Sequence, residues 1–401
     1  MDFSIPPHVT DLARRVQQFV DSVVIPVEHE LHQSGAELTI EQLNAMRAEA
    51  KAAGLWCPTM PRNLGGLGLN IQEIVPVFEA AGRSLLGPLA IHCAAPDEGN
   101  MHLLHLYANE AQVERYLRPL VAGGAFSGFS MTEPPPGAGS DPTMIRTQAV
   151  REGDEWVING RKWYTTNGEV ADFFLIMAVT DPTVAAKHGC SIFVAPRDTP
   201  GINIVRDVPT IGQKDFGGHV EIVYEDVRLK DADILGELGA GFGMAQARLG
   251  PARLTHCMRW MGIAQRALEI AAEYASTREA FGSKLIEHQA VGFMLADSEM
   301  ELHAGRLMVQ QAAWLLANGD QAREETSMAK VFVSEAVNRI VDRAIQITGG
   351  TGISRDLPLS NWYEAARAFR IYDGASEVHR MVAARRVRKK YGASTRPQAA
   401  D

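Results

Sequence analysis

Cysteine is scarce in this sequence. The 401 residues include four cysteines, which are far apart and form no CxxC pair: Cys57, Cys93, Cys190 and Cys257. Such spacing indicates neither a disulfide framework nor a structural zinc site, so we interpret the four as buried thiols. His102 and His105 lie three residues apart on a helical pattern but have no convincing carboxylate partner, so we expect no metal site.

The sequence also lacks the marks of membrane, secreted and nucleic-acid-coating proteins. No uninterrupted apolar segment is long enough to span a bilayer, and residues 1–20 contain charged side chains and two prolines rather than an apolar secretory segment. Lys and Arg number 39 against 48 Asp and Glu, a net charge of −9, which argues against a nucleic-acid partner. We therefore expect a soluble, cytoplasmic protein with no membrane span.

Apolar residues are plentiful, and near the N-terminus they follow a helical order. An apolar content of 46% over this length allows two or three cores. From Leu12 to Leu31 apolar positions recur at steps of three or four, which predicts a helix with one buried face, bent at Pro26. Helical patterns continue beyond an intervening loop, so we expect residues 1–124 to form an N-terminal helical domain.

The pattern changes at residue 125. Short apolar or β-branched runs between Gly, Pro and Asp predict a central antiparallel β domain over 125–233. Its expected strands are 156–164, 173–179, 191–194, 202–205 and 220–224. Long helical patterns then return and predict a C-terminal helical bundle over 234–391, followed by a loose tail, 392–401. The expected bundle helices are 244–276, 287–317, 323–347, 359–368 and 376–390. The predicted fold class is α+β.

One acidic residue near the C-terminus stands where catalysis could occur. Asp373 lies between Tyr372 and Gly374, just ahead of the basic helical pattern 378–391. A carboxylate at such a helix entrance can project into a cleft and act as a general base. An Asp-Gly pair is also a common helix cap and turn. The residues of this segment alone leave both interpretations open.

Three other parts of the chain share residues suited to a cofactor. The loop 131–141 carries hydroxyls and free amides that can hydrogen-bond a flat heterocycle, and 159–168 adds aromatic faces and more hydroxyls. The segments 278–289 and 346–352 supply an arginine and a glycine turn, which suit a pyrophosphate. Each segment could instead have a purely structural role. These roles are a proline-rich strand end, a core tryptophan, a solvated arginine and a glycine pair that ends a helix.

Together, and in this order, these segments resemble the acyl-CoA dehydrogenase family over nearly the whole chain. The shared motifs are T-E-P…G-S-D in 132–141, N-G-x-K-x-[W/Y]-x-T-N-G in 159–168, R-x-x-F-G…H-Q in 278–289, Q-x-x-G-G-x-G in 346–352 and Y-[E/D]-G-x-S in 372–376. The resemblance implies an N-terminal helical domain, a central β domain and a C-terminal helical bundle. It also implies FAD as the cofactor and a homotetramer built as a dimer of dimers.

Matching positions to the family's motifs implies a role for individual residues. Those expected around the isoalloxazine ring of FAD are Thr132, Ser140, Tyr164, Thr165 and Thr166, with Thr166 near N5. Those expected to hold the ADP half of FAD across a subunit boundary are Arg278, Phe281, His288, Gln289, Gln346 and Gly350. Three more match cofactor-contacting positions: Ala375, Ser376 and Glu377. The positions expected beside the substrate are Ser140, Arg253 and Gly374.

The sequence departs from the common pattern of the family at the base. Most members have Glu where this chain has Asp373, whose side chain is shorter by about 1.5 Å. The other position used for a base in some members is matched by Ala252, which cannot serve. A misplacement of about 1 Å can cost on the order of a hundredfold in rate, so we expect the surrounding site to have adapted.

Two further departures lie in the β domain, and a subgroup shares this combination. The usual ring-shielding tryptophan is displaced, with Trp163 one residue early and Tyr164 in its place, and the T-E-P loop is lengthened by Pro135 and Pro136. The segments 94–101, 256–259 and 373–379 look like the Asp-containing branch of the family. That branch includes dehydrogenase domains fused to kinase-like domains.

The resemblance implies a definite reaction. Asp373 would remove a proton from the carbon next to the thioester carbonyl of an acyl-CoA while flavin N5 takes hydride from the next carbon, giving a trans-2-enoyl-CoA. Donors to the carbonyl oxygen would be a flavin ribityl hydroxyl and the backbone N–H of Asp373. Desolvation beneath the acyl chain is expected to raise the pKa of Asp373. An electron-transfer flavoprotein is the expected acceptor, and fatty-acid β-oxidation the expected setting.

Two alternatives stay open. A nitroalkane oxidase-like enzyme of the same fold also uses an Asp base and passes electrons to oxygen, without CoA. A non-catalytic helical scaffold would keep the fold but bind no flavin. The length, branching and ring content of the acyl chain depend on pocket volume, which the sequence does not give.

Overall fold

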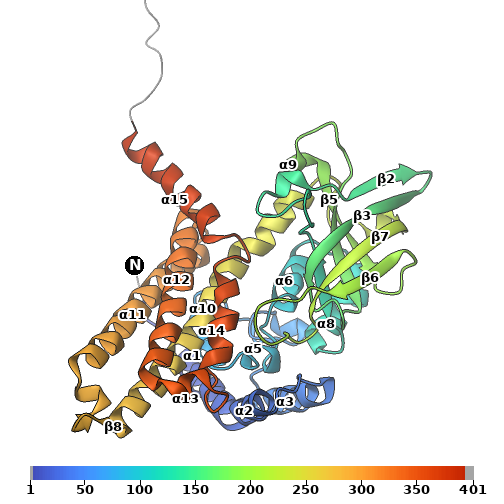
Figure 1. Ribbon diagram of the computed structural model, residues 1–401. Helices are drawn as coiled ribbons and strands as arrows, with labels where there is room; N and C mark the ends of the chain where they lie inside the picture. Colours follow the sequence, from blue (N-terminus) through green and yellow to red (C-terminus); the bar gives the residue numbers. More distant parts are fainter. Residues whose placement is uncertain (1–2, 393–401) are drawn as a thin grey trace, which may run out of the picture.

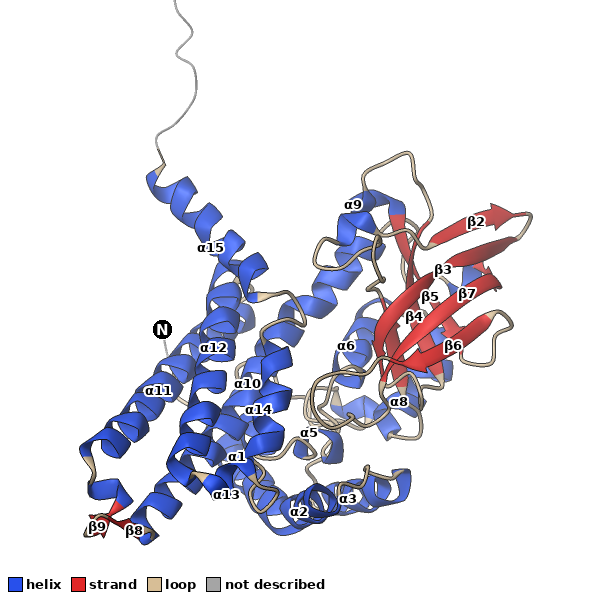
Figure 2. Ribbon diagram, viewed as in Figure 1, coloured by secondary structure: helices blue, strands red, loops and turns tan. Residues whose placement is uncertain are grey.

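The computed structural model describes residues 3–392. Helices form both ends of this described range, and a curled sheet lies between them in sequence and to one side in space (Figures 1 and 2). This confirms the α+β class with a helical N-terminal part, a β middle and a helical C-terminal part. The predicted tail lies outside the described residues apart from Gly392. None of the helices in this described range is long and apolar enough to cross a membrane.

The first helical segment differs in detail from its prediction. It runs as α1 (Pro7–Phe19), a π-helical segment η1 (Val20–Val24) and α2 (Ile25–Ser34). Pro26 lacks an N–H and its ring crowds the preceding turn, which the wider π turn accommodates. Because that turn holds an extra residue, the buried face moves to Val20 and Val24. The predicted bend at Pro26 is thus a widened turn just before it.

The remaining N-terminal elements are short. They are α3 (Ile40–Ala52), η2 (Arg62–Leu64), α4 (Ile74–Ala81), α5 (Gly87–Ala90), α6 (Asp97–Tyr107), α7 (Glu110–Gln112), η3 (Val113–Leu117) and α8 (Arg118–Ala122). Helix α3 begins at a capping box, in which Thr39 and Gln42 each accept from the backbone N–H of the other.

The central sheet contains all five predicted strands and two more. Its strands are β1 (Ser127–Ser130), β2 (Gln148–Glu152), β3 (Glu155–Thr166), β4 (Phe173–Val179), β5 (Cys190–Pro196), β6 (Ile202–Asp207) and β7 (His219–Lys230). The order is β1-β4-β2-β3-β7-β6, with β5 paired to β4. Pairing is antiparallel except where β1, and one residue of β2, run parallel to β4. Between the strands lie η4 (Pro142–Met144), α9 (Ala186–Gly189) and η5 (Asp231–Asp233).

The C-terminal bundle follows the predicted helices to within a few residues. It comprises α10 (Gly241–Thr277), a hairpin of β8 (Glu279–Ala280) and β9 (Ser283–Lys284), η6 (Leu285–Glu287), α11 (Gln289–Ala317), α12 (Arg323–Thr348), α13 (Gly350–Ile353), α14 (Leu359–Phe369) and α15 (Ser376–Tyr391). Helix α15 points away from the rest of the bundle (Figure 1). Only Ser376 and His379 of this helix are buried.

The hydrophobic cores cross the predicted domain limits. One core joins α1 and α4 to the bundle helices α10, α11, α12 and α14. A second joins helices α6 and α8 to one side of β4 and β5, and a third fills the opposite side of the sheet. Strands β4 and β5 are therefore buried on both faces, which accounts for their unbroken apolar sequences. The limits at 124 and 233 stay predictions.

Candidate active site

Asp373 lies in the loop between α14 and α15, with its backbone in the left-handed region at φ 53°. This conformation is uncommon for a non-glycine residue and needs support from its surroundings. The carbonyl of Asp373 accepts hydrogen bonds from Arg253 Nε at 2.9 Å and His379 Nε2 at 3.2 Å. The N-cap of α15 is Ala375, and no side chain caps that helix, so the interpretation of Asp373 as a helix cap is wrong.

The carboxylate of Asp373 faces a histidine on α10. Its Oδ2 lies 3.2 Å from Nε2 of His256, and its side chain is 20% exposed, so it is not turned into solvent. The His256 ring packs against Tyr372, with ring centroids 4.7 Å apart. Within residues 3–392 the backbone N–H of Asp373 donates no hydrogen bond, which leaves it free to bind a carbonyl oxygen.

Positive charge and hydrogen bonding control the ionisation of Asp373. Burial alone would raise the pKa of this carboxyl, but the hydrogen bond from His256 and the positive charges of Arg248 and Arg253 outweigh it and lower the pKa. The rise expected from desolvation beneath a bound acyl chain stays a prediction. Asp373 is a carboxylate, and hence able to accept a proton, throughout the neutral pH range.

Arg248 connects this loop to the other two parts of the molecule. Its guanidinium lies 4.2 Å above the ring centroid of Phe129 on β1, and its Nε donates to Asn100 Oδ1 on α6 at 2.8 Å. Burial lowers the pKa of Arg248, and the nearby carboxylates of Asp373, Glu98 and Asp97 oppose that effect. Sequence reasoning gave this residue no role, because the contacts come from three separate elements.

On the β-domain side, a buried ion pair fixes the T-E-P loop. Lys162 Nζ lies 2.9 Å from Glu133 Oε1, and both side chains are almost fully buried. Glu133 also accepts from the N–H and hydroxyl of Thr147. The N–H of Trp163 donates to the carbonyl of Thr132 at 3.0 Å. The T-E-P and N-G-x-K motifs are thus two halves of one support, which holds Thr132 beside strand β3.

A β-bulge at the end of β3 determines how its aromatic residues point. Lys162 pairs with Ile222 and Thr165 with Val220, so Trp163 and Tyr164 together face one residue of β7. Tyr164 has φ 51°, unlike a residue in a regular strand, and its side chain is 44% exposed. The bulge lies at the two positions, Trp163 and Tyr164, where the sequence departs from the family pattern.

The threonines after the bulge point to opposite faces. Thr165 is fully buried, and its hydroxyl pairs with Ser130 at 3.1 Å, so its side chain offers nothing at the surface. Thr166 is half-buried, and its hydroxyl lies 3.0 Å from His219 Nδ1. Ser140 is exposed in the loop after β1. Thr132, Tyr164 and Thr166 are therefore all at least partly accessible.

The remaining predicted residues fall into two separate groups. Gly374, Ala375, Ser376 and Glu377 adjoin Asp373 at the start of α15. The other group lies at the opposite end of the bundle, around the β8–β9 hairpin, at the start of α11 and where α12 meets α13 (Figure 1): Arg278, Phe281, His288, Gln289, Gln346 and Gly350. Phe281 is 99% exposed, with φ 53°. His288 Nε2 lies 3.1 Å from the carbonyl of Ala280 and steadies this hairpin.

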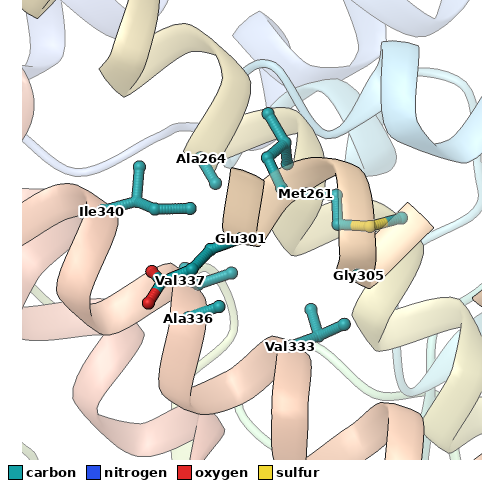
Figure 3. A pocket seen from close by; sticks show the side chains of 9 residues that line it. Met261, Ala264, Glu301, Gly305, Val333, Ala336, Val337 and Ile340 are labelled. Carbon is teal, nitrogen blue, oxygen red and sulfur yellow. The ribbon is translucent and has the colours of Figure 1, made fainter. Parts of the chain in front are cut away.

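Two hollows in the protein lie away from Asp373. Figure 3 shows a gap between α10, α11 and α12, lined by side chains such as Met261, Val333 and Ile340. Its volume of about 10 Å³ is too small for a ligand. A groove of about 410 Å³ runs over α1, α4 and α10, but its Arg83 and Arg306 already form ion pairs. Neither is lined by the predicted site residues.

Comparison with known proteins identifies the family. Family models described as the acyl-CoA dehydrogenase N-terminal, middle and C-terminal domains match residues 7–124, 128–227 and 239–388. The chain belongs to the acyl-CoA dehydrogenase family. Members of this family are FAD-dependent oxidoreductases, and this protein is one of them.

Individual relatives match over nearly the whole chain. The acyl-CoA dehydrogenase FadE2 of Mycobacterium tuberculosis is 39% identical, covering 94% of this chain and 95% of that protein. Acyl-CoA dehydrogenase family member 11 of Rattus norvegicus is 37% identical over 92% of this chain, which spans 49% of that longer protein. A solved structure described as an acyl-CoA dehydrogenase from Mycobacterium abscessus superposes with a TM-score of 0.90 at 39% identity, covering 97% of this chain and 100% of that one.

The residues of the β domain fit a flavin. The exposed Tyr164 ring offers a flat apolar face, and the half-buried hydroxyls of Thr132 and Thr166 can hydrogen-bond a heterocycle. The buried Nε1–H of Trp163 finds no acceptor within the described residues, so a donor beside this face is unused. A flat ring with several acceptor atoms matches this set.

Sequence reasoning missed the contact between His256 and Asp373. Arg253, His256 and Arg259 follow one another at steps of three on α10, which places them on one helical face. That spacing was a usable signal, but it did not show that the Asp373 loop packs against this face.

Proposed function

We propose that this protein catalyses FAD-dependent α,β-dehydrogenation of an acyl-CoA thioester to the trans-2-enoyl-CoA, with Asp373 as the base. The observation that carries the proposal is the placement of the Asp373 carboxylate. It is ionised, mostly shielded from water and directed at a neutral histidine, in a loop whose backbone is held by two donors. Such an arrangement serves no capping role and suits proton removal.

The chain's own residues perform three tasks in this reaction. Asp373 takes the α-proton, and its backbone N–H, which donates no hydrogen bond within residues 3–392, would donate to the thioester carbonyl beside Gly374. Arg253 holds the Asp373 carbonyl and so fixes the loop beside the substrate. The bound FAD supplies the acceptor for the hydride from the neighbouring carbon.

The residues that would hold FAD lie in three places: on the β domain, at the start of α15, and around the β8–β9 hairpin. Thr132, Ser140, Tyr164 and Thr166 lie on the β domain, and Thr165 can contribute only through its backbone. Ala375, Ser376 and Glu377 adjoin the base. Arg253 contacts the Asp373 loop, whereas Arg278 ends the same helix. At about 1.5 Å of rise per residue these two arginines are roughly 37 Å apart, farther than one FAD reaches.

A second copy of the chain would bring residues of both groups to the same FAD. The hairpin residues Arg278, Phe281, His288 and Gln289, with Gln346 and Gly350, would hold the ADP half of FAD in the partner's site. The Phe281 ring is 99% exposed, and helix α15 is exposed along most of its length. Both features support the idea that other subunits cover these surfaces. We therefore propose a homotetramer, a dimer of dimers with FAD sites shared between subunits.

The remaining expectations concern partners and setting. We propose an acyl-CoA substrate, an electron-transfer flavoprotein as electron acceptor, and a cytoplasmic role in fatty-acid β-oxidation. Reoxidation of the substrate-reduced enzyme tests the acceptor directly. Rapid reoxidation by electron-transfer flavoprotein and slow reoxidation by air are expected. The reverse order would favour the oxidase alternative.

The test of the proposal is Asp373→Asn, assayed by anaerobic bleaching of the flavin absorbance with a panel of acyl-CoA substrates. The amide cannot accept the α-proton, so bleaching should fall by a factor on the order of 10³ while the flavin content is unchanged. Asp154→Asn is the matched control, because Asp154 is an exposed turn residue of the β domain. Bleaching of the Asp373→Asn protein at the rate of that control would remove Asp373 from the role.

A further inference from the structure

The segment His256-Cys257-Met258-Arg259 on α10 takes no part in the three tasks of the proposed reaction. His256 lies between two charged groups. Its Nε2 is 3.2 Å from Asp373 Oδ2, and its Nδ1 is 3.2 Å from Arg259 Nη2. Arg259 is itself fixed, because its Nη1 donates to the carbonyl of Cys93 at 2.7 Å.

These contacts determine the tautomer of His256. A guanidinium can only donate hydrogen bonds, so Nδ1 of His256 must accept from Arg259 and carries no proton. The single N–H of the neutral ring is then at Nε2 and points at Asp373. Asp373 therefore accepts a hydrogen bond at Oδ2 from a donor that cannot turn away.

The groups packed around His256 keep it neutral. Its neighbours are Arg259 on its own helix, Lys330 from α12, and Asp373 with Tyr372 from the loop before α15. Burial and the charge of Arg259 lower the pKa of His256 to about 4, against the opposing effect of Asp373. At neutral pH the ring has its Nε2 proton and does not release or take up another.

We propose that His256 is a positioning residue that fixes Oδ2 of Asp373, so that Oδ1 is the oxygen that removes the α-proton. This inference rests on the proposed function of Asp373. In the step, the α C–H bond breaks, its electron pair remains with the substrate, and an O–H bond forms at Oδ1. The proton on His256 stays on Nε2 throughout. Asp is one methylene shorter than the Glu of most family members, and fixing the rotation of its carboxylate compensates for that difference.

Two substitutions separate positioning from packing. In His256→Gln the side-chain amide can still reach and donate to Oδ2, whereas His256→Leu fills the space without a donor. We expect His256→Leu to slow anaerobic flavin bleaching by about 10- to 100-fold. The acid limb of its pH–rate profile should move up by about one pH unit, because the Asp373 carboxylate loses a hydrogen-bond donor and its pKa rises. His256→Gln should stay within a few-fold of the wild type with an unmoved limb.

The control is His32→Gln, which replaces a buried histidine on α2 that bonds the Leu357 carbonyl. Should His256→Leu lose its flavin, His256→Asn takes its place, since its amide is too short to reach Oδ2. The proposal is overturned if the donor-free variant matches His32→Gln in rate and acid limb, or if His256→Gln is equally slow with no shift of the limb. If Asp373→Asn itself bleaches normally, the proposed function fails instead, whatever the His256 variants show.

Discussion

The middle of helix α10, which faces Asp373, and its C-terminal end, at the β8–β9 hairpin, present opposite kinds of surface. In the middle, Arg253, His256 and Arg259 are each paired with a group of the same chain. At the hairpin end, Arg278 is exposed and forms no ion pair within residues 3–392, and Phe281 is almost fully in solvent. The first region holds its geometry through contacts within one chain, whereas the second has the surface expected of a contact with another molecule. A site that uses both must therefore join two chains.

The largest expected effect on flavin content comes from the hairpin end of α10. Arg278→Glu places a negative charge where we expect the pyrophosphate of FAD, so the purified protein should lose at least about 90% of its bound flavin, a cost of about 1.4 kcal/mol or more in binding. The unfolding free energy of the apoprotein should change by less than about 0.5 kcal/mol, because the side chain is exposed. Flavin absorbance and urea denaturation measure the two quantities.

Lys187→Glu is the matched control, a charge reversal at an exposed position of the β domain. It should keep its flavin. Equal flavin content in both variants would show that the hairpin end of α10 does not bind FAD.

The largest expected effect on stability concerns the buried ion pair that supports the T-E-P loop. Glu133→Gln leaves the Lys162 ammonium buried without its carboxylate, which should lower the unfolding free energy by about 3–5 kcal/mol. Glu152→Gln breaks an exposed pair with Arg228 at 3.1 Å and should cost less than about 1 kcal/mol. Urea denaturation compares the two. Similar costs would show that the T-E-P loop is not fixed by this ion pair.

A smaller effect should appear on acidification. Burial and the charge of Arg253 lower the pKa of His379 to about 4, although its hydrogen bond to the Asp373 carbonyl opposes the shift. Because the folded protein binds this proton less readily than the unfolded chain, stability is full above about pH 6.5 and is lost as the pH falls toward 4. The contribution is about 1.4 kcal/mol per pH unit at most.

His379→Gln keeps a donor to the Asp373 carbonyl but does not titrate. Its unfolding free energy, measured in urea between pH 7 and pH 4.5, should fall less steeply than that of the wild type. An identical slope in the two proteins would mean that His379 is not held neutral by the fold.

The sequence predicted the elements of this fold well, because each is encoded locally. Apolar spacing located the long helices, and β-branched runs between turn residues located five strands. The π segment before Pro26 was missed because apolar spacing does not show where one extra residue enters a turn. Likewise, the bulge at Trp163 and Tyr164 depends on pairing with β7, which the β3 sequence alone does not contain.

The site could be predicted only in part, for the same physical reason. Motif positions picked out Asp373, but its lowered pKa arises from Arg248, His256 and Arg253 on a helix more than a hundred residues earlier. The N-cap alternative could be rejected only from the φ of Asp373 and the start of α15. The pKa of a site residue depends on contacts between elements that are distant in the sequence, and these contacts become visible only in the folded structure.

The most direct test of a shared site mixes two inactive variants. Asp373→Asn lacks the base, and Arg278→Glu lacks the FAD contact, so neither alone should bleach flavin with an acyl-CoA. After the two are unfolded together and refolded with FAD, half of the dimers should be mixed. Each mixed dimer should have one intact site, which restores about a quarter of the wild-type activity. No recovery in verified mixed oligomers would contradict the account, because it would place Asp373 and Arg278 in the same site of one chain.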